Sequence, residues 1–422
     1  MSVADSAERF LPYGRQAIDD ADIAAVVEVL KGDYLTTGPK VAAFEAALAA
    51  KLGARFAVSN SSGTAALHLA CLALGLGPGD AAIVPSVTFL ATANAVRMVG
   101  AAVVFADVDP DNGLMRPEDL EAAFARADAA GLKVRAVFPV HLAGQCADMT
   151  SLSALARRRG AAVVEDACHA IGAYHACGAD HADSEGAAAA VGSCRLSDMA
   201  ILSFHPVKTV AAGEGGAVTT NDPALARRLE RLRAHGMVRD GAEFENADMA
   251  FDESGRANPW YYEMPEIGWN YRLSDIHAAL ALSQLERLDG FVETRRQLAR
   301  RYDDLLAPLA PRIEPIRRSR FSTPAWHLYP VLIDFTGAGT ERAQVMNRLR
   351  AQGIGTQVHY IPVHRQPYYR KLDPGLVLPG AERYYARTLS LPLFVGMTPA
   401  DVKRIVACLN DAVGVSAVRE AS

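Results

Sequence analysis

The stretch of sequence that decides the fold is residues 134–166, VRAVFPVHLAGQCADMTSLSALARRRGAAVVED. It begins with an apolar run at 134–140 and ends with a second one at 162–166. Between them, residues 149–159 place Leu152 and Leu155 at helical spacing and end in three consecutive arginines. A strand, an amphipathic helix and a second strand in this order predict a βαβ unit with two parallel strands.

The same alternation fills the first two thirds of the chain. Five further runs are candidate strands: 55–59, 82–84, 103–107, 199–204 and 216–220. Prolines mark three helix starts, at Pro39, Pro117 and Pro223, the last of them after Asn221-Asp222. We therefore expect an α/β protein whose seven candidate strands form a mostly parallel sheet, covered by helices on both faces.

From about residue 272 the pattern changes. Residues 273–309 predict one long or broken helix, and a smaller α/β unit follows it. That unit has candidate strands at 328–333 and 356–360 and candidate helices at 342–352 and 399–413. We expect a large domain at 11–271, a connecting helix at 272–310 and a small C-terminal domain at 311–422. The polar, irregular segment 237–265 is long enough to be a functional or mobile loop.

Composition limits the possible classes of protein. A length of 422 residues favours two or three domains, and 50% hydrophobic with 22% charged residues is typical of a globular protein. A net charge of −5 argues against nucleic-acid binding through a diffuse positive field. Six scattered cysteines favour a reducing compartment, and the acidic N-terminus and short apolar runs indicate neither a signal peptide nor a membrane span. We expect a soluble, cytoplasmic protein.

Polar residues follow four of the predicted strands, where ligands of open α/β sheets bind. They are Asp166, Lys208, Gln145 and the Ser61-Ser62-Gly63-Thr64 segment. The Ser-Ser-Gly-Thr segment is either a phosphate-binding turn or an ordinary helix cap. Lys208 is either a Schiff-base amine or a surface lysine, and Asp166 binds a cationic ring nitrogen or caps a turn. A pyridoxal 5′-phosphate (PLP) enzyme needs all three together, and their joint presence favours that chemistry.

Two histidine-rich segments allow further interpretations. His169, His175, Cys177 and His181 match no standard zinc spacing, so we expect no metal site. The segment 359–369, which contains His359, Tyr360 and His364, either lines a polar ligand site or is a strand with alternating side chains.

Several ordered motifs resemble one family. They are SSGTAAL (61–67), EDACHA (165–170), SFHPVKT (203–209), GEGGAV (213–218) and NYRLSD (270–275). Over nearly the whole chain, from about Leu11 to Leu409, the sequence is similar to the DegT/DnrJ/EryC1/StrS family of PLP-dependent sugar-nucleotide aminotransferases. Within it, HPVK (205–208), WYYEM (260–264) and VHYIPVH (358–364) resemble the branch of UDP-4-amino-4,6-dideoxy-N-acetyl-β-L-altrosamine transaminase, of the pseudaminic acid pathway.

The resemblance implies the type I aminotransferase fold, with a seven-stranded sheet domain, a small C-terminal domain and a homodimer that shares its active sites. Lys208 would carry PLP and move the proton between substrate and coenzyme, and Asp166 would bind the ring nitrogen. The other implied coenzyme contacts are Phe89 stacked on the ring, His169 near the 3′-oxygen, Ser62, Gly63, Thr64 and Ser203 at the phosphate, and Asn270 of the partner subunit.

For the substrate, the resemblance implies L-glutamate as amino donor and C4 of a UDP-linked 4-keto-6-deoxy-N-acetylhexosamine as acceptor. The implied contacts are Tyr13, Asp33, Tyr34, Leu35, Thr36, Ser62, Ser203, Asn270, His327, Leu328 and Tyr329. Alternatives are another UDP-, dTDP- or GDP-keto sugar, a PLP-dependent dehydratase, which has His in place of the lysine, and a non-catalytic PLP-binding protein. The sequence departs from the family in a longer segment at 175–190 and in Val210-Ala211-Ala212.

Overall fold

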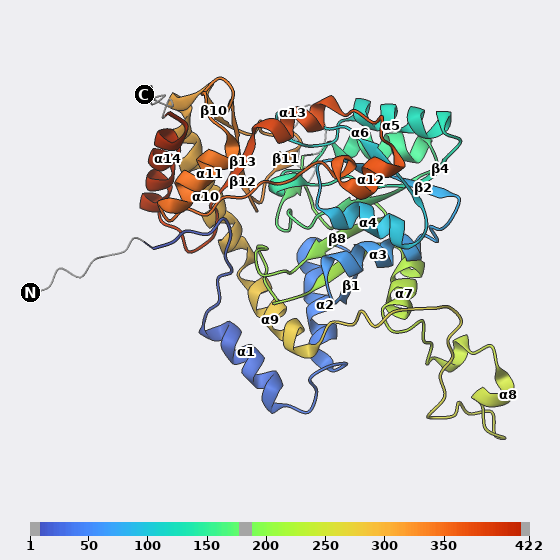
Figure 1. Ribbon diagram of the computed structural model, residues 1–422. Helices are drawn as coiled ribbons and strands as arrows, with labels where there is room; N and C mark the ends of the chain where they lie inside the picture. The colour runs from blue at the N-terminus through green and yellow to red at the C-terminus, as the bar shows by residue number, and fades with distance from the viewer. Residues whose placement is uncertain (1–8, 177–187, 415–422) are drawn as a thin grey trace, which may run out of the picture.

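The computed structural model describes residues 9–176 and 188–414. A seven-stranded sheet in the order β1-β9-β8-β5-β4-β2-β3 forms the centre of the large domain (Figure 1). β9 is antiparallel to both of its neighbours, and the other strands run parallel to one another. The strands are β1 (Phe56–Asn60), β2 (Asp80–Pro85), β3 (Ala102–Ala106), β4 (Lys133–Val137), β5 (Ala162–Asp166), β8 (Met199–Ser203) and β9 (Gly216–Thr220). The prediction of a mostly parallel sheet built from these seven runs is confirmed.

Alternate residues of the strands pack against helices on opposite faces of the sheet. Val84 and Val164 belong to the hydrophobic cluster that contains α3, α4 and α7, whereas Ile83 and Val163 pack with α5 and α6. The side-chain period of two in a strand causes this division. The helices of this domain are α1 (Asp20–Lys31), α2 (Pro39–Leu52), α3 (Gly63–Ala73), α4 (Leu90–Met98), α5 (Pro117–Ala129), α6 (Met149–Arg158) and α7 (Pro223–Leu232). Pro39, Pro117 and Pro223 stand at helix starts, as the sequence predicts.

The predicted connecting helix is broken into α9 (Asp275–Glu286) and α10 (Leu288–Leu306). The break lies at Arg287, whose φ of −97° and ψ of 4° depart from helical values. Beyond it, a small antiparallel sheet in the order β10-β12-β13 packs with α10 and α13, and α14 packs against α10 and α11. Its strands and helices are β10 (Ile313–Pro315), β12 (Tyr329–Ile333), β13 (Thr388–Leu391), α11 (Arg342–Ala351), α12 (Pro367–Leu372), α13 (Pro379–Arg387) and α14 (Pro399–Gly414).

The predicted strand at 356–360 is wrong. Only Gln357 pairs with a neighbour, Ser390 of β13, through two backbone hydrogen bonds. The amide of Val358 donates to the side chain of Gln357 at 2.8 Å, so this amide is not available to continue the ladder. The chain therefore leaves the sheet here and brings His359 and Tyr360 to a cavity that Asp166 and Lys208 also line.

Two irregular segments complete the architecture. The N-terminal segment pairs with the small domain, where Leu11 exchanges hydrogen bonds with Gly353 and Gly355. The segment 237–265, with the short α8 (Ala247–Ala250), extends away from the sheet at the lower right of Figure 1. A third small sheet joins β6 (Tyr174–His175), β7 (Ala189–Ala190) and β11 (Ser322–Thr323), and single 3-10 turns occur at Leu142–Gly144, Gly241–Glu243, Ala307–Leu309 and Val363–Arg365. Among the described residues, no helix is long and apolar enough to cross a membrane.

Candidate active site

A cavity of about 480 Å³ opens at the carboxyl ends of β5 and β8, beside the start of α3. This is the position where open α/β sheets bind ligands. The large domain contributes Asp166, Lys208 and the 62–64 turn, and the small domain contributes His359 and Tyr360. The cavity therefore lies between the two domains.

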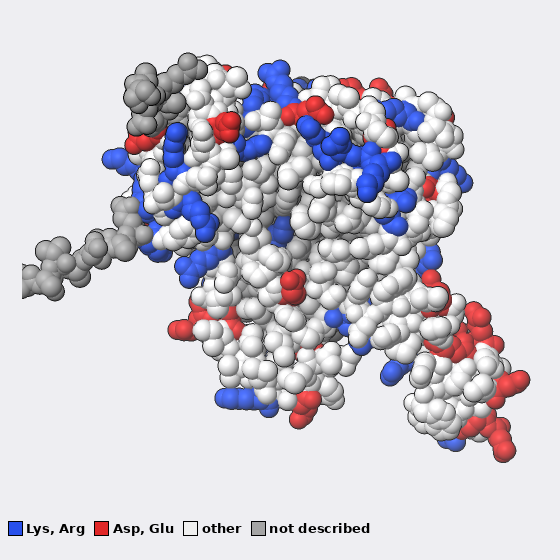
Figure 2. All heavy atoms as spheres, in the orientation of Figure 1, with Lys and Arg blue, Asp and Glu red and all other residues white. Residues whose placement is uncertain are grey.

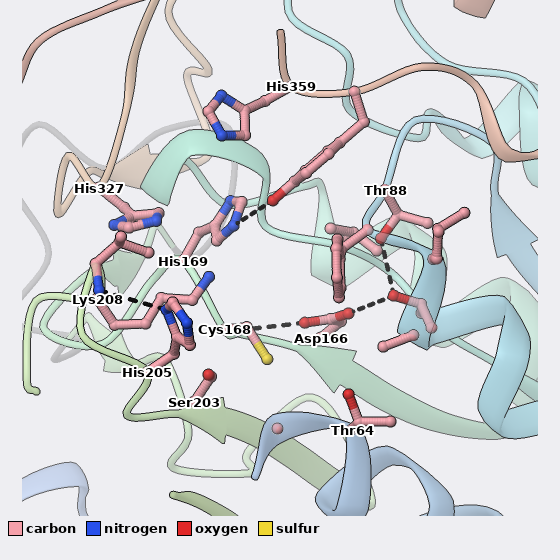
Figure 3. A pocket seen from close by; sticks show the side chains of 18 of the residues that line it. Thr64, Thr88, Asp166, Cys168, His169, Ser203, His205, Lys208, His327 and His359 are labelled. Carbon is pink, nitrogen blue, oxygen red and sulfur yellow. Dashed lines mark hydrogen bonds between the residues drawn. The ribbon is translucent and has the colours of Figure 1, made fainter. Parts of the chain in front are cut away.

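Asp166 ends β5 and points into this cavity (Figure 3). Its carboxylate accepts a hydrogen bond from the hydroxyl of Thr92 at 2.7 Å, and Thr92 in turn bonds Thr88 at 2.8 Å. The backbone amide of Cys168 donates to the other carboxylate oxygen at 3.3 Å. These donors orient a buried carboxylate that can bind a protonated ring nitrogen.

Lys208 lies on the loop between β8 and β9 and extends into the same cavity. Burial lowers the pKa of its amine, although the neighbouring Cys168 and Asp166 oppose this shift. The pKa of the Cys168 thiol is raised well above its usual value by burial and by the charge of Asp166. The cavity therefore contains an amine that loses its proton more readily than a free lysine does, and beside it a thiol that stays protonated.

The turn between β1 and α3 is shaped by close backbone contacts. The Ser62 hydroxyl accepts a hydrogen bond from the amide of Ala65 at 3.1 Å, so it caps α3. A Cβ atom on Gly63 would lie 2.9 Å from the Cβ of Ser203, which leaves room for glycine only. Thr64 completes this part of the cavity wall. A helix start with a glycine, hydroxyls and free amides fits the phosphate of PLP, so Lys208, Asp166 and this turn together fit the coenzyme.

His169 and Tyr360 form a defined hydrogen-bond chain across the cavity. The amide of Ala143 donates to Nδ1 of His169 at 3.3 Å, which leaves the ring proton on Nε2. Nε2 therefore donates to the hydroxyl of Tyr360 at 3.0 Å, and the hydroxyl proton of Tyr360 is left for another acceptor. Phe89 lies beside them, with its ring centroid 6.0 Å from that of Tyr360.

Two further histidines and a tyrosine line the small-domain side of the cavity. His359 bonds the hydroxyl of Ser390 at 2.9 Å, and burial together with the charge of Lys208 lowers its pKa to about 3. The ring of Tyr13 lies 5.3 Å from that of His359. His327 lies 4.5 Å from His169 between ring centroids. The predicted substrate residues Tyr13 and His327 thus lie in the cavity, together with the 359–360 pair.

Several other predicted residues do not line this cavity. Leu328 and Tyr329 are buried in the hydrophobic core of the small domain, where Tyr329 stacks on Tyr302 and donates to Asp303. The side chains of Leu328 and Tyr329 both pack inward at the start of β12, and their contact with the substrate stays a prediction. Gln145 bonds the 317–319 segment instead of a ligand.

A second group of predicted residues is exposed on the surface of the same subunit. Asn270 is exposed, and Tyr34 and Leu35 are 60% and 49% exposed. The members of this group are Asp33, Tyr34, Leu35, Thr36 and Asn270, and none of them lines the cavity of its own subunit.

Thr88, Thr92 and Cys168 surround Asp166 and are not among the residues that the sequence predicts for the site. Thr92 lies in the first turn of α4, and Thr88 lies just before this helix, where its hydroxyl bonds that of Thr92. Nothing in the sequence indicates that Thr92 faces a carboxylate 74 positions away.

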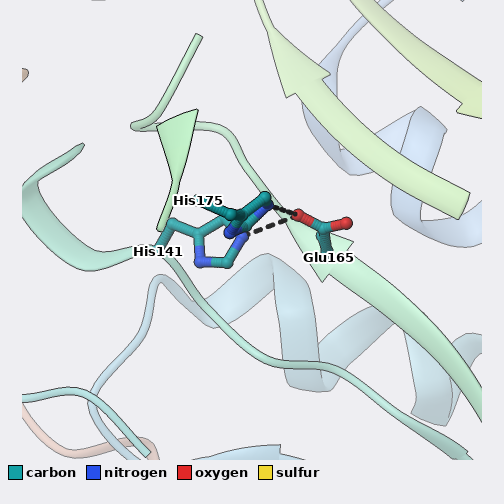
Figure 4. Close-up of side chains that lie close together, drawn as sticks. All are labelled: His141, Glu165 and His175. Carbon is teal, nitrogen blue, oxygen red and sulfur yellow. Dashed lines mark hydrogen bonds and ion pairs between the residues drawn. The ribbon is translucent and has the colours of Figure 1, made fainter. Parts of the chain in front are cut away.

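A second buried cluster lies behind β5 (Figure 4). Glu165 faces away from Asp166, and its carboxylate accepts hydrogen bonds from His141 at 2.8 Å, from His175 at 2.9 Å and from Ser197. The amide of Ala147 donates to Nδ1 of His141, so the ring proton is on Nε2, which is then unavailable as a metal ligand.

The four residues weighed as metal ligands are therefore not one cluster. His175 bonds Glu165, whereas His169 bonds Tyr360 in the cavity that contains Lys208 and Asp166. Cys177 and His181 lie outside the described residues.

Comparison with known proteins agrees with this geometry. Residues 16–410 match the model of the DegT/DnrJ/EryC1/StrS aminotransferase family. The structure is similar to that of Helicobacter pylori PseC, an aminotransferase involved in the biosynthesis of pseudoaminic acid, with 27% identity and a TM-score of 0.80 over 96% of this chain and 99% of PseC. It is similar to DesV from S. venezuelae, with 32% identity and a TM-score of 0.79 over 97% and 100% of the two chains.

A third similar structure is that of Spr1654 from Streptococcus pneumoniae in its PLP form, with 26% identity and a TM-score of 0.81 over 96% and 98% of the two chains. The family and this structure imply PLP as the coenzyme. The fold is that of type I PLP aminotransferases, and the enzyme is a sugar aminotransferase. The chain belongs to the DegT/DnrJ/EryC1/StrS aminotransferase family.

Proposed function

We propose that this enzyme transfers the amino group of L-glutamate to C4 of a UDP-linked 4-keto-6-deoxy-N-acetylhexosamine, in the biosynthesis of a nonulosonic acid of the pseudaminic type. The observation that carries the proposal is the amine of Lys208 in one cavity with Asp166 and the 62–64 turn. The similarity to PseC over 96% of the chain supports the sugar. A cytoplasmic location belongs to the same proposal and rests on the scattered cysteines.

The two catalytic residues are Lys208 and Asp166. When bound, PLP supplies an electron-withdrawing ring that stabilises negative charge at the carbon next to the transferred nitrogen. Asp166, held by Thr92 and the amide of Cys168, keeps a proton on the ring nitrogen. Lys208 Nζ takes the proton from the substrate carbon and returns it to C4′ of the coenzyme, and its lowered pKa keeps a larger share of the amine unprotonated.

The remaining coenzyme contacts are assigned by position in the cavity. Ser62, Gly63, Thr64 and Ser203 hold the phosphate at the start of α3, where the helix dipole favours an anion. Phe89 covers one face of the ring. His169 lies on the side of the 3′-oxygen, where its Nε2 donates to the hydroxyl of Tyr360 and leaves the Tyr360 proton for an acceptor.

A homodimer would complete the site. Asn270 and the 33–36 segment are exposed on their own subunit and are free to reach the cavity of a second copy. Trp260 and Ile267 are 74% and 73% exposed, and apolar side chains this exposed are typical of an interface. We assign Asn270 of the partner subunit to the phosphate, the 33–36 segment and Tyr13 to the sugar nucleotide, and His327 to substrate binding.

The main alternative is an aminotransferase for a different UDP-, dTDP- or GDP-keto sugar. The similarity to Spr1654, which is named a sugar aminotransferase without a pseudaminic acid role, supports this alternative. A PLP-dependent dehydratase carries His in place of the Schiff-base lysine, so Lys208 argues against it. A non-catalytic PLP-binding protein would keep Asp166 and the 62–64 turn without transferring an amino group.

The test is an absorption spectrum of the PLP-loaded protein before and after addition of L-glutamate, followed by a panel of UDP-, dTDP- and GDP-linked keto sugars. We expect glutamate to abolish the visible absorption of the coenzyme and the UDP-linked 4-keto sugar to restore it. Lys208→Ala is expected to bind PLP but show neither change, because it lacks the amine that moves the proton. An unchanged spectrum with glutamate, or wild-type turnover by Lys208→Ala, would overturn the proposal.

A further inference from the structure

Three buried imidazoles form one side of the active-site cavity. Figure 3 shows His169, His327 and His359 on one side of Lys208, with Ser203 and Thr64 on the other. We call these three histidines the imidazole wall. Their exposed fractions are only 7%, 4% and 6%. The wall therefore faces the part of the cavity opposite the phosphate turn.

Only one residue of the imidazole wall has a buried polar atom left unmatched. Both ring nitrogens of His169 are engaged, by Ala143 and Tyr360, and Nδ1 of His359 bonds Ser390. Nδ1 of His327 is buried and has no hydrogen-bond partner among the described residues. The unmatched Nδ1 is sealed from solvent, whereas Nε2 of His327 has no hydrogen-bond partner among the described residues and is not sealed, so Nε2 is the ring nitrogen that a ligand in the cavity reaches.

A buried cation lies behind His327. Arg295 is 2% exposed, and its guanidinium donates to the backbone carbonyls of Trp326, His327 and Leu393 at 3.4, 3.2 and 2.8 Å. Its Nε has no hydrogen-bond partner, and no carboxylate of the described residues lies within ion-pair distance of it. Burial lowers its pKa to about 10, so Arg295 is still charged at neutral pH. The protein thus places an uncompensated positive charge next to His327.

We propose that His327, supported by the charge of Arg295, is the anchor for a carboxylate of the amino donor. This inference rests on the proposed function and names the donor-recognition residue of the same site. Among the described residues that line the cavity, Lys208 is the only lysine and no arginine is present. An anionic donor must therefore use imidazoles, amides or groups of a second subunit.

The position of His327 favours the donor over the sugar nucleotide. In an amino-acid donor the carboxylate is bonded directly to the carbon that reacts beside Lys208. The diphosphate of a sugar nucleotide lies several bonds away from its reacting carbon. His327 is close enough to Lys208 for the charge of the lysine to lower its pKa. A residue this near the reacting amine is in reach of the donor carboxylate.

Binding of the carboxylate is coupled to a proton. In the free site, burial lowers the pKa of His327 well below its usual value, and Lys208, His169, Arg295 and His359 lower it further. These are the titratable and charged groups that face His327. The negative charge of a bound carboxylate counteracts these effects and stabilises the imidazolium of His327. The site therefore takes up a proton on binding, and its affinity for the carboxylate falls as the pH rises.

Calorimetry of the PLP-loaded enzyme with glutarate, an unreactive dicarboxylate, tests the inference. Titration at one pH in two buffers of different ionisation heat gives the proton uptake, and repeats at pH 6.5 and 8.5 give the trend. His327→Phe removes both the hydrogen bond and the charge, and His327→Gln keeps only a hydrogen bond. His205→Gln is the matched control, because His205 is an exposed histidine at the rim of the same cavity. UDP-N-acetylglucosamine serves as the probe for the nucleotide site.

We expect the wild type to take up a proton and His327→Phe to lose about 10- to 100-fold in glutarate affinity, the range for a charge-assisted hydrogen bond. His327→Gln keeps part of the affinity without proton uptake, and both variants bind the nucleotide as the wild type does. Wild-type glutarate affinity in His327→Phe, or loss of nucleotide affinity instead, overturns the inference. If the wild type still reacts with L-glutamate, either of these two results overturns only the inference about His327, and the proposed function stands. If the wild type neither reacts with L-glutamate nor binds glutarate, the proposed function falls as well.

Discussion

The buried cluster behind β5 allows a quantitative prediction for Glu165→Gln. The glutamine keeps the shape of the side chain and removes the only negative charge of the cluster. Burial by itself lowers the pKa of His175, but the charge and hydrogen bond of Glu165, together with the neighbouring Cys146, outweigh this and raise it to about 10. In the same cluster, His175 and His141 hold the pKa of Glu165 below its usual value, although burial acts to raise it. The variant therefore leaves His175 without its counter-ion.

The magnitude follows from the pKa of His175 in the folded and unfolded protein. That pKa is about 10 when folded and 6.5 when unfolded. A raised folded pKa gives stability that is complete below pH 6.5 and is lost as the pH rises to 10. The whole shift contributes about 4 kcal/mol at pH 7 and about 1.5 kcal/mol at pH 9, which are upper bounds for Glu165→Gln because Cys146 also raises this pKa. For 422 residues melting as one unit, these energies correspond to falls in Tm of roughly 4 to 5 °C and 2 °C.

The assay is scanning calorimetry of the wild type and Glu165→Gln at pH 7 and pH 9, at one scan rate and with saturating PLP. We expect the difference in Tm between the two proteins to shrink at pH 9. Ser197→Ala is the control, because it removes a neutral donor to the same carboxylate and its effect does not depend on pH. A difference for Glu165→Gln that is equal at both pH values would refute the assignment of an imidazolium to His175.

Two further predictions concern coenzyme binding. Thr92→Val removes the hydroxyl that donates to Asp166, and we expect the Kd for PLP, measured by fluorescence titration, to rise about 10- to 100-fold; an unchanged Kd would contradict the role of Thr92. Gly63→Ala is expected to weaken PLP binding by about tenfold or more, because its Cβ would lie 2.9 Å from that of Ser203. Gly290→Ala, in open space on α10, is the matched control and should leave PLP binding unchanged while raising Tm slightly.

The sequence predicted the seven strands because each is a short apolar run with its own boundary signals. The same local signals placed Asp166 at a strand end and the 62–64 turn at a helix start. They were insufficient at 356–360, where apolar alternation indicated a strand. There the side chain of Gln357 takes the amide of Val358, and the ladder ends. The spacing of apolar residues along the sequence does not reveal that a side chain competes with the neighbouring strand for one amide hydrogen.

The sequence by itself therefore determined the fold class, the sheet and the lysine, carboxylate and glycine turn to which we assign the coenzyme. Only the tertiary structure decided which distant groups surround them. It joined Tyr360 to His169 across 191 positions and placed Glu165 and Asp166 on opposite sides of β5. The physical reason is that strands and helix caps arise from interactions within a few residues, whereas the partners of a buried polar group depend on how whole elements pack.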